Sequence, residues 1–402
     1  MGRSLWIIIV SAGLILGIVA GIRQGFGLFL LPMSTGSGVS REAFAFSMGL
    51  QNLIWGFGAP IAGAVADRYG PRLVAAAGIV FYVGGIVVMA VDWGGGQLLA
   101  SGFLVGIGMS GAGFSVVLSA VGRAAPAAQR AKALALASFG GSIGQFVALP
   151  YTHVLISEIG WVAALVILGA TSLLAVPLAM GLGPRVEAGE SPGGGARLSL
   201  GAALGVAARD RSFVLLTIGF FVCGFQLAFI MIHLPPYLGD QGMAPWLGAA
   251  ALTLVGVFNI AGTLACGWLG QRFEKRLVLT GLYLMRTALL AGFMLAPLTE
   301  ASVLVFAAGM GLTWLPTIPL TNGLVAQIFG PTYLSTLFGI VFLSHQLGGF
   351  VGPWLGGLAY DWTGSYAAVW WICAGLGLLA AMLHWPIDER RAARPALAGS
   401  PA

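Results

Sequence analysis

Twelve long apolar runs, separated by short polar stretches, most constrain the fold of this 402-residue chain. Each run holds roughly the 20 apolar residues that a helix needs to cross a bilayer. The expected spans are residues 5–33, 43–66, 72–92, 97–122, 131–155, 160–182, 212–238, 246–270, 276–297, 300–326, 332–357 and 365–385. Only 8% of the residues are charged, against about 25% in soluble domains. The sequence therefore predicts an all-α membrane protein in contact with a lipid bilayer.

The basic residues are distributed asymmetrically between the two sides of the expected membrane. Sixteen of the 19 lysines and arginines fall in stretches that share one side, whereas Arg41 lies on the other side. Cytoplasmic loops carry such an excess of positive charge. We therefore expect both termini in the cytoplasm and, for a bacterial chain, the inner membrane. Because this asymmetry accounts for the net charge of +6, nucleic acid is not an expected partner.

An internal repeat divides the chain into two halves. The polar loop at residues 63–72 has a degenerate copy at residues 267–276, which is 204 residues later. The same offset places Pro32 on Pro236 and Gly144 on Gly348. We therefore expect two six-helix pseudo-symmetric bundles, with a cytoplasmic linker between them and a tail after them. The predicted boundaries are 1–182, 183–211, 212–387 and 388–402.

The first of these loops carries a family signature. It matches Gly-x-x-x-Asp-Arg-x-Gly-x-Arg, which the major facilitator superfamily carries between its second and third helices. The resemblance implies the major facilitator fold and a transporter whose two halves rock about a central site. Asp67 is expected to receive helix ends and arginines of the facing half, and Gly70 to permit the turn. The expected gating residues are Asp67, Arg68, Gly70, Arg72, Arg272 and Arg276.

Within that superfamily the chain is similar to the bacterial monocarboxylate-porter-like branch. The similarity lies in residues 21–32, 51–56, 258–267 and 337–348. It implies a monocarboxylate substrate, with proton symport as a possible partner reaction. Better-known monocarboxylate transporters carry an Asp and an Arg one turn apart on helix 8, and the span at 246–270 has neither. Their acidic, tryptophan-rich start of helix 1 is also missing here.

Two arginines fall inside expected spans. Burying a charge near the bilayer centre costs about 2.5–3.5 kcal/mol, so each must face protein or water. Arg23 in the first span could clamp a carboxylate through two parallel N–H donors, or it could bond backbone carbonyls at a kink. Arg286 lies in the ninth span, which the resemblance makes peripheral. It could bind an anion or serve structure and gating.

Two histidines could carry a substrate or a proton, because histidine titrates near neutral pH. His233 lies seven residues after Gln226 and just before Pro235-Pro236, where we expect the helix to break. His345 and Gln346 lie in the middle of the eleventh span. Each could instead be a hydrogen-bonded residue between helices. The remaining candidate binding residues are Gln51, Asn52, Gln145, Asn259, Trp314 and Asn322, which could equally hold helices together or pack.

All 13 acidic residues fall in loops or at span ends. No carboxylate is therefore expected near the membrane centre to carry a proton or bind a cation, and the central charge is positive. The sequence predicts a monomeric secondary or facilitative transporter for a small organic anion. An efflux carrier for neutral amphiphiles, with a structural Arg23, is the alternative. The histidines form no metal-binding motif, and neither an enzyme activity nor a cofactor is expected.

Overall fold

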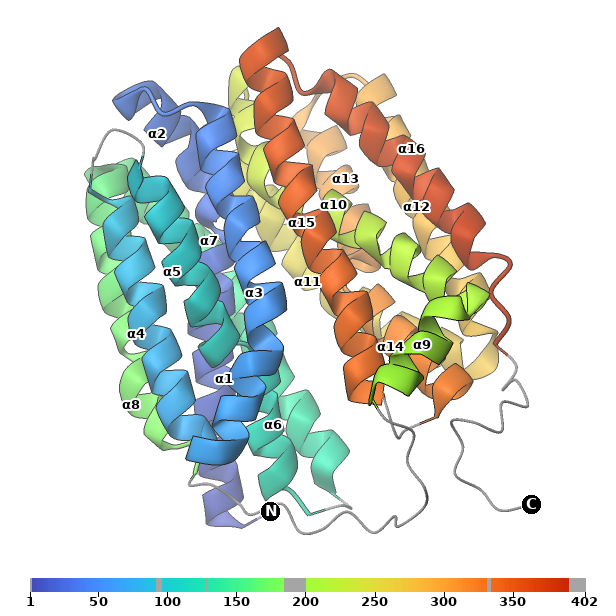
Figure 1. Cartoon of the computed structure of the whole chain (residues 1–402). Helices are drawn as coiled ribbons and strands as arrows, with labels where there is room; N and C mark the ends of the chain where they lie inside the picture. Colours follow the sequence, from blue (N-terminus) through green and yellow to red (C-terminus); the bar gives the residue numbers. More distant parts are fainter. Residues whose placement is uncertain (1, 92–95, 127–128, 184–199, 331–333, 390–402) are drawn as a thin grey trace, which may run out of the picture. The chain divides into compact units, whose positions relative to one another are not determined.

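The computed structural model describes the chain except residues 1, 92–95, 127–128, 184–199, 331–333 and 390–402. Every regular element in the described part is a helix (Figure 1). The first half holds α1 (Arg3–Gln24), the 3-10 helix η1 (Phe26–Phe29), α2 (Leu30–Ser37), α3 (Arg41–Tyr69), α4 (Pro71–Met89), α5 (Gly96–Ala112), α6 (Phe114–Ala124), α7 (Arg130–Leu173) and α8 (Ala175–Met180). The rest holds α9 (Leu200–Arg209), α10 (Arg211–Asp240), α11 (Pro245–Arg272), α12 (Lys275–Leu295), α13 (Glu300–Thr313), α14 (Thr317–Phe329), α15 (Leu334–Thr363) and α16 (Ala367–His384).

The expected spans correspond to these helices. Nine stretches of the described chain are long and apolar enough to cross a membrane. One of them, 132–180, contains two expected spans, which meet at Gly160 with φ of 80°. The helices α3 and α15, which are not among these nine, correspond to the two remaining expected spans. Both helices carry polar side chains along much of their length, such as Gln51 in α3 and His345 in α15.

Four expected spans are interrupted rather than continuous, and in the sixth α7 ends at Leu173 and α8 begins at Ala175. The first changes from α1 through η1 to α2, and the fourth breaks at Gly113 between α5 and α6. The tenth breaks between Thr313, which ends α13, and Thr317, which begins α14. Broken helices are tolerated at membrane depth where protein groups satisfy the freed backbone.

The seventh span contradicts an expectation, because it does not break at its two prolines. The helix α10 continues through Pro235 and Pro236 to Asp240. The missing proline N–H groups leave the carbonyls of Met231 and Ile232 without their helical partners. The backbone of Gly27 lies against both carbonyls, so closely that a Cβ at Gly27 would overlap the Met231 oxygen. The helix therefore continues through the prolines instead of breaking, with Gly27 packed against the two carbonyls that they free.

Contacts divide the chain into two compact units. Unit 1 contains residues 1–187, 228–257 and 349–366, and unit 2 contains residues 188–227, 258–348 and 367–402. In unit 1, α1 packs on α7 and α5 packs on both α3 and α4 (Figure 1). In unit 2, α12 packs on α16. The boundaries cut α10, α11 and α15, whereas the predicted halves meet in the linker, of which residues 184–199 lie outside the described part.

The internal repeat is visible in the contacts of each unit. In unit 1, the Tyr82 hydroxyl donates to the carbonyl of Val19 at 2.9 Å. In unit 2, Arg286 donates to Sγ of Cys223 at 3.3 Å, and both members of this pair stand 204 residues after the first pair. The register found in the loops therefore also relates helix–helix contacts.

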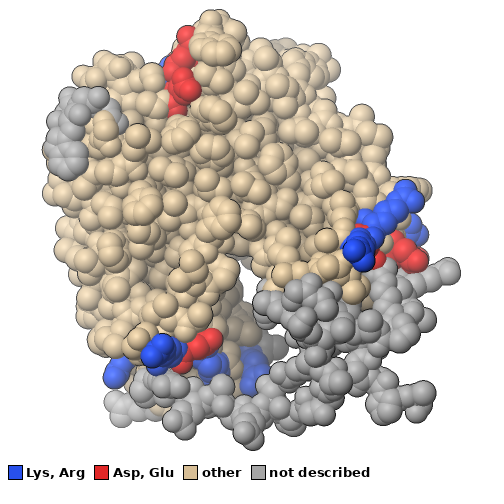
Figure 2. All heavy atoms as spheres, in the orientation of Figure 1, with Lys and Arg blue, Asp and Glu red and all other residues tan. Residues whose placement is uncertain are grey.

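Charged side chains on the face shown in Figure 2 lie near the ends of the helices, and the surface between them is uncharged. Large apolar side chains such as Ile61, Leu264 and Val305 are exposed by 66–72%. A protein surface of this kind suits lipid rather than water as its surroundings.

Candidate functional site

Arg23 near the end of α1 is surrounded by three side chains of α3. Its Nε donates to Oε1 of Gln51 at 3.2 Å, and its Nη2 donates to Oδ1 of Asn52. The guanidinium carbon also lies 5.4 Å from the ring centre of Trp55. These partners are neutral, and in the described part of the chain Arg23 makes no ion pair. The structure thus places two predicted binding residues, Gln51 and Asn52, around the charge of a third, Arg23.

The space beside this guanidinium is small and mostly apolar. It is too narrow to admit a water molecule, and its walls come from η1, α3 and α10: Phe26, Met48, Gln51, Met231 and Ile232. Arg23 is half-buried, whereas Gln51 and Asn52 are only 1% and 4% exposed. Electrostatic interactions are stronger where water is excluded. A planar guanidinium presents two parallel N–H donors to a carboxylate, and the space beside Arg23 must widen to admit one.

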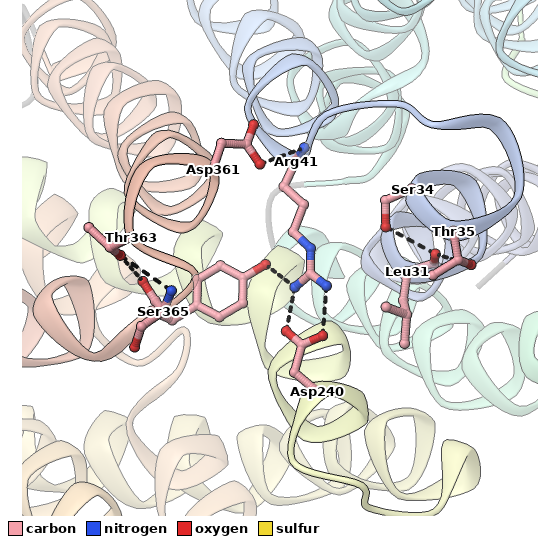
Figure 3. Close-up of polar contacts among 9 residues, drawn as sticks. Leu31, Ser34, Thr35, Arg41, Asp240, Asp361, Thr363 and Ser365 are labelled. Carbon is pink, nitrogen blue, oxygen red and sulfur yellow. Dashed lines mark hydrogen bonds and ion pairs between the residues drawn. The ribbon is translucent and has the colours of Figure 1, made fainter.

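A second polar cluster joins α3, α10 and the residues after α15 (Figure 3). The guanidinium of Arg41 donates to both carboxylate oxygens of Asp240, with 2.6 Å from Nη2 to Oδ1. It also donates to the hydroxyl of Tyr366 at 2.9 Å and lies 3.6 Å from the ring centre of Tyr360. The Arg41 side chain is 8% exposed. A shielded bidentate pair of this kind is stronger than an exposed ion pair.

The first residues of α3 also receive a carboxylate from α15. The N–H groups of Arg41 and Glu42 donate to the two oxygens of Asp361, at 3.2 and 2.8 Å. Negative charge is favourable at a helix N-terminus, where N–H groups lack helical partners. In return, Nε1 of Trp354 donates to the Glu42 carboxylate at 3.1 Å.

These contacts continue inward along one face, which we call the α3–α15 seam. Phe46 packs against Phe350 with ring centres 5.3 Å apart. A Cβ at Gly49 would lie 2.7 Å from the carbonyl oxygen of Phe350, so the two backbones touch there. At the inner end Nδ2 of Asn52 donates to the carbonyl of Gly349 at 2.9 Å. The seam comprises Arg41, Glu42, Phe46, Gly49 and Asn52 of α3 and Gly349, Phe350, Trp354, Gly357 and Asp361 of α15.

His233 lies beside this seam rather than at Arg23. Its ring is fully buried, and Nε2 donates to the carbonyl of Pro353 in α15 at 2.8 Å. The ring centre lies 4.9 Å from that of Tyr366, which contacts Arg41. The structure therefore gives His233 a backbone partner, and its expected role in carrying a substrate or proton stays a prediction.

Arg286 is fully buried in unit 2 and contacts the break in the tenth span. Its Nη2 donates to the carbonyls of Thr313 and Trp314, the latter at 2.8 Å. On the other side of the break, Oδ1 of Asn259 accepts the N–H of Leu315 at 2.9 Å. These two side chains thus satisfy backbone groups that the interruption frees.

The remaining candidate residues have other partners within their own units. Oε1 of Gln145 accepts from Gln24 at 3.4 Å, while Nε2 of Gln226 donates to the carbonyl of Cys373 at 2.8 Å. Nδ1 of His345 donates to Oε1 of Gln346 at 3.0 Å. Among the described residues, Oδ1 of Asn322 has no hydrogen-bond partner. Arg286 also lies 3.5 Å from Oε1 of Gln226.

The signature loop pairs within its own unit. Asp67 forms an ion pair with Arg123 at the end of α6, at 2.6 Å, and its expected gating role at the facing half stays a prediction. The ion pair forms because α6 packs beside α3 and carries Arg123 to its end. Gly70 has φ of 93°, a conformation that favours glycine, as the tight turn required. Arg68 and Arg72 are exposed.

The second copy of the loop makes different contacts. Arg276 donates to Glu274 at 2.7 Å and to the carbonyl of Trp385 at 2.8 Å. Arg272 lies over the ring of Trp268 in its own helix, at 4.1 Å. The tail after residue 389 lies outside the described part.

The seam was not among the predicted sites. The one available signal was that Arg41 is the single basic residue expected on its side of the membrane. Its partners Asp240 and Asp361 stand in polar loops or span ends, where acidic residues are common. Only the fold brings these three positions together. Within the described residues no group of His, Cys, Asp and Glu is arranged to hold a metal ion.

Solved structures similar to this chain are transporters. A bacterial homolog of the human lysosomal transporter Spinster has a TM-score of 0.74 and 17% identity, with complete coverage of both chains. The D-xylose-proton symporter has a TM-score of 0.70 and 18% identity, with 99% of both chains covered. At this identity the likeness shows the fold, and it confirms the expected twelve-helix major facilitator architecture.

Relatives in sequence carry transporter names. Monocarboxylate transporter 11 of Mus musculus is 27% identical over 94% of this chain and 86% of its own length. The uncharacterized MFS-type transporter YcxA of Bacillus subtilis is 24% identical over 92% of both chains. The family model of the Major Facilitator Superfamily matches residues 5–321. The chain therefore belongs to the major facilitator superfamily, whose members are multi-pass membrane transporters and not enzymes.

Proposed function

We propose that this secondary transporter carries a small organic anion, with monocarboxylates as the first class to test, and that Arg23 binds the carboxylate. The observation that carries the proposal is the half-buried guanidinium of Arg23, held within an apolar span by neutral carboxamides. A charge in that position is costly unless it has a function or a counter-ion. An anionic substrate supplies the counter-ion.

The names of the sequence relatives support the same class. Monocarboxylate transporters 11 of Mus musculus and 13 of Rattus norvegicus match 94% of this chain at 27% and 26% identity. Their names describe monocarboxylates as cargo of those proteins. The lack of the Asp and Arg pair in α11 means that any monocarboxylate here is held by other residues, and Arg23 is the candidate on α1.

We place the α3–α15 seam at the outer side of a bacterial inner membrane, with both termini in the cytoplasm. The distribution of basic residues supports this orientation, because Arg41 is the lone basic residue on the seam side. With the seam closed, the substrate would reach Arg23 from the cytoplasmic side. Opening of the seam would then complete alternating access by a monomeric carrier.

If a proton is transported together with the anion, we propose that the substrate carries it. The carboxylates nearest the seam, Asp240, Asp361 and Glu42, are bound to Arg41, backbone N–H groups and Trp354. His233 faces a backbone carbonyl. A proton that crosses together with the anion is therefore most simply carried by the substrate's own carboxyl group.

Uptake by proteoliposomes tests the proposal. Purified protein is supplied with labelled acetate, lactate and benzoate, and the wild-type protein is compared with Arg23→Gln. We expect uptake of at least one anion by the wild type and loss of most of it in Arg23→Gln. A matched control is Arg130→Gln, which removes an exposed cation at the start of α7. Wild-type uptake rates in Arg23→Gln would contradict the carboxylate-binding role.

A second candidate function is efflux of neutral amphiphiles. The observation that favours it is the apolar wall of Phe26, Met48, Met231 and Ile232 beside Arg23. In that case Arg23 is structural, bonding Gln51 and Asn52 to hold α1 on α3. Transport of an uncharged dye that persists in Arg23→Gln, together with no anion uptake by the wild type, would favour this function.

A further inference from the structure

We propose that Asn52 couples the occupancy of Arg23 to the α3–α15 seam, holding the seam closed while no anion is bound. The inference rests on the proposed function, because it requires an anion at Arg23. Its basis is that one carboxamide bonds both the guanidinium of α1 and the backbone of α15.

The two ends of the Asn52 side chain make different contacts. Oδ1 accepts from Nη2 of Arg23, while Nδ2 donates to the carbonyl of Gly349 at 2.9 Å. Nδ2 also lies 3.2 Å from the carbonyl of Met48 in its own helix. Because a carboxamide is planar, fixing its oxygen also fixes the direction of its N–H groups. The bond from Arg23 therefore orients the donor that reaches α15.

The helix α15 approaches Asn52 of α3 this closely because residue 349 is a glycine. A Cβ at Gly349 would lie 3.3 Å from both Cγ and Nδ2 of Asn52, which is tighter than ordinary packing. Asn52 itself is only 4% exposed. The Asn52 carboxamide is thus packed closely between α3 and α15.

A carboxylate bound to Arg23 competes with Asn52 for the same donor. A guanidinium–carboxylate pair uses two N–H donors and is stronger than a bond to a neutral oxygen. Nη2 would therefore turn from Asn52 to the anion. The freed carboxamide loses its orientation, and its bond to Gly349 weakens because linked hydrogen bonds reinforce one another.

The positions of the other seam contacts explain why loss of the bond from Asn52 to Gly349 can start the opening of the seam. At the outer end the seam closes through Asp361, which accepts the N–H groups of Arg41 and Glu42, and at the inner end through Asn52. Loss of the inner bond removes the contact nearest the ligand and leaves the outer cluster to open next. Thermodynamic linkage requires the reverse effect as well, so that an open seam raises the affinity of Arg23 for the anion.

The neighbouring Gln51 provides a matched control. It also accepts from Arg23, at 3.2 Å, but its Nε2 lies 2.9 Å from Sδ of Met48 in α3 itself. Gln51→Met and Asn52→Leu each remove one polar partner of Arg23 while keeping the side-chain size close. Only Asn52→Leu also removes the bond to Gly349.

The experiment measures amide hydrogen exchange over residues 350–361 in purified full-length protein, with and without acetate, lactate or benzoate. Binding of each probe is followed separately by its effect on the Tm. In the wild type we expect a bound probe to raise exchange over this segment at least threefold. Asn52→Leu should show the raised exchange without a probe, and a bound probe should add little. Gln51→Met, which keeps the bond from Asn52 to Gly349, should keep the low exchange of the wild type when no probe is present.

A second variant covers the case in which Asn52→Leu folds poorly. Asn52→Asp keeps the size and places a carboxylate on Arg23, but its oxygens cannot donate to Gly349. We expect raised exchange over 350–361 and no stabilisation by any probe, since the internal carboxylate occupies Arg23.

The outcomes separate the two proposals. If a probe stabilises the wild type but both Asn52 variants keep its basal exchange and its response, the coupling is overturned and the anion site stands. If the Asn52 variants loosen the seam but no probe stabilises the wild type, the anion site fails, and the coupling fails with it.

Discussion

Arg286 shows how a buried charge can be held entirely by neutral groups. It is fully buried, and its guanidinium contacts Cys223, Gln226 and two backbone carbonyls of the broken tenth span. The sequence left anion binding and structure open for this residue. These contacts favour a structural role, in which Arg286 compensates the carbonyls of Thr313 and Trp314.

Replacing Arg286 should therefore cost stability more than it costs selectivity. Arg286→Met leaves two buried carbonyls without a partner, each worth about 1–3 kcal/mol. Tyr82→Phe, at the repeat-related position, removes a single hydroxyl bond worth about 1 kcal/mol. We expect a clearly larger fall in Tm for Arg286→Met. If its Tm matches the wild type while anion uptake is lost, Arg286 belongs to the binding site instead.

His233 is expected to act as a hydrogen-bond donor to Pro353 and not as a proton carrier. His233→Gln can still donate to that carbonyl, so uptake and its dependence on pH should resemble those of the wild type. His233→Leu loses the bond and should lower the stability by about 1 kcal/mol. Uptake at a series of pH values checks both variants. A changed pH profile in His233→Gln would show that the ring titrates during transport.

At the scale of whole helices, the apolar runs were enough to predict the elements but not their interruptions. The break between Thr313 and Thr317 depends on Arg286 and Asn259, which come from two other helices. Conversely, the helix α10 continues through two prolines, and Gly27 packs on the carbonyls that they free. Local sequence reports neither effect, since both arise from partners far away in the chain.

The pairing of α3 with α10 at Arg41 and Asp240 makes a second element-scale prediction. Breaking a shielded ion pair is costly because it leaves one charge unpaired. Asp240→Asn and Arg41→Gln should each raise amide exchange at the start of α3. The free energy of local opening calculated from this exchange should fall less in the double variant than the sum of the two single losses. Close partners show coupling energies of about 0.5–3 kcal/mol in such cycles. Strict additivity of the two effects would mean that the pair contributes no coupling to the closed seam.

At the scale of the molecule, the repeat was the most informative prediction. Gly144 approaches Gly17 and Gly21 so closely that a Cβ would overlap their backbones, and Gly348 approaches residues 221 and 225 in the same way. All these positions keep the 204-residue offset. The family signature and the twelve spans thus predicted the fold. The α3–α15 seam could not be predicted, because the sequence does not show which polar residues at the ends of spans are in contact.

The candidate site at Arg23 could be predicted only in part, because the sequence does not show which polar residues lie next to one another. A charge within an apolar span is visible in sequence, and two of its partners, Gln51 and Asn52, were among the candidates. Candidates on the later helices, such as Gln226 and His345, bond other residues of unit 2. A polar residue in a span is therefore a weak guide to a ligand unless its neighbours are known.

Direct measurement of carboxylate affinity tests the central claim that Arg23 binds the transported anion. Titration calorimetry with the best-transported probe among acetate, lactate and benzoate would compare the wild type with Arg23→Lys and Arg23→Gln. Charge-assisted hydrogen bonds contribute about 1.5–3 kcal/mol, so Arg23→Gln should weaken binding about tenfold to a hundredfold. Arg23→Lys should fall between, because it keeps the charge but not the paired donors. Equal affinity in all three proteins would contradict the claim.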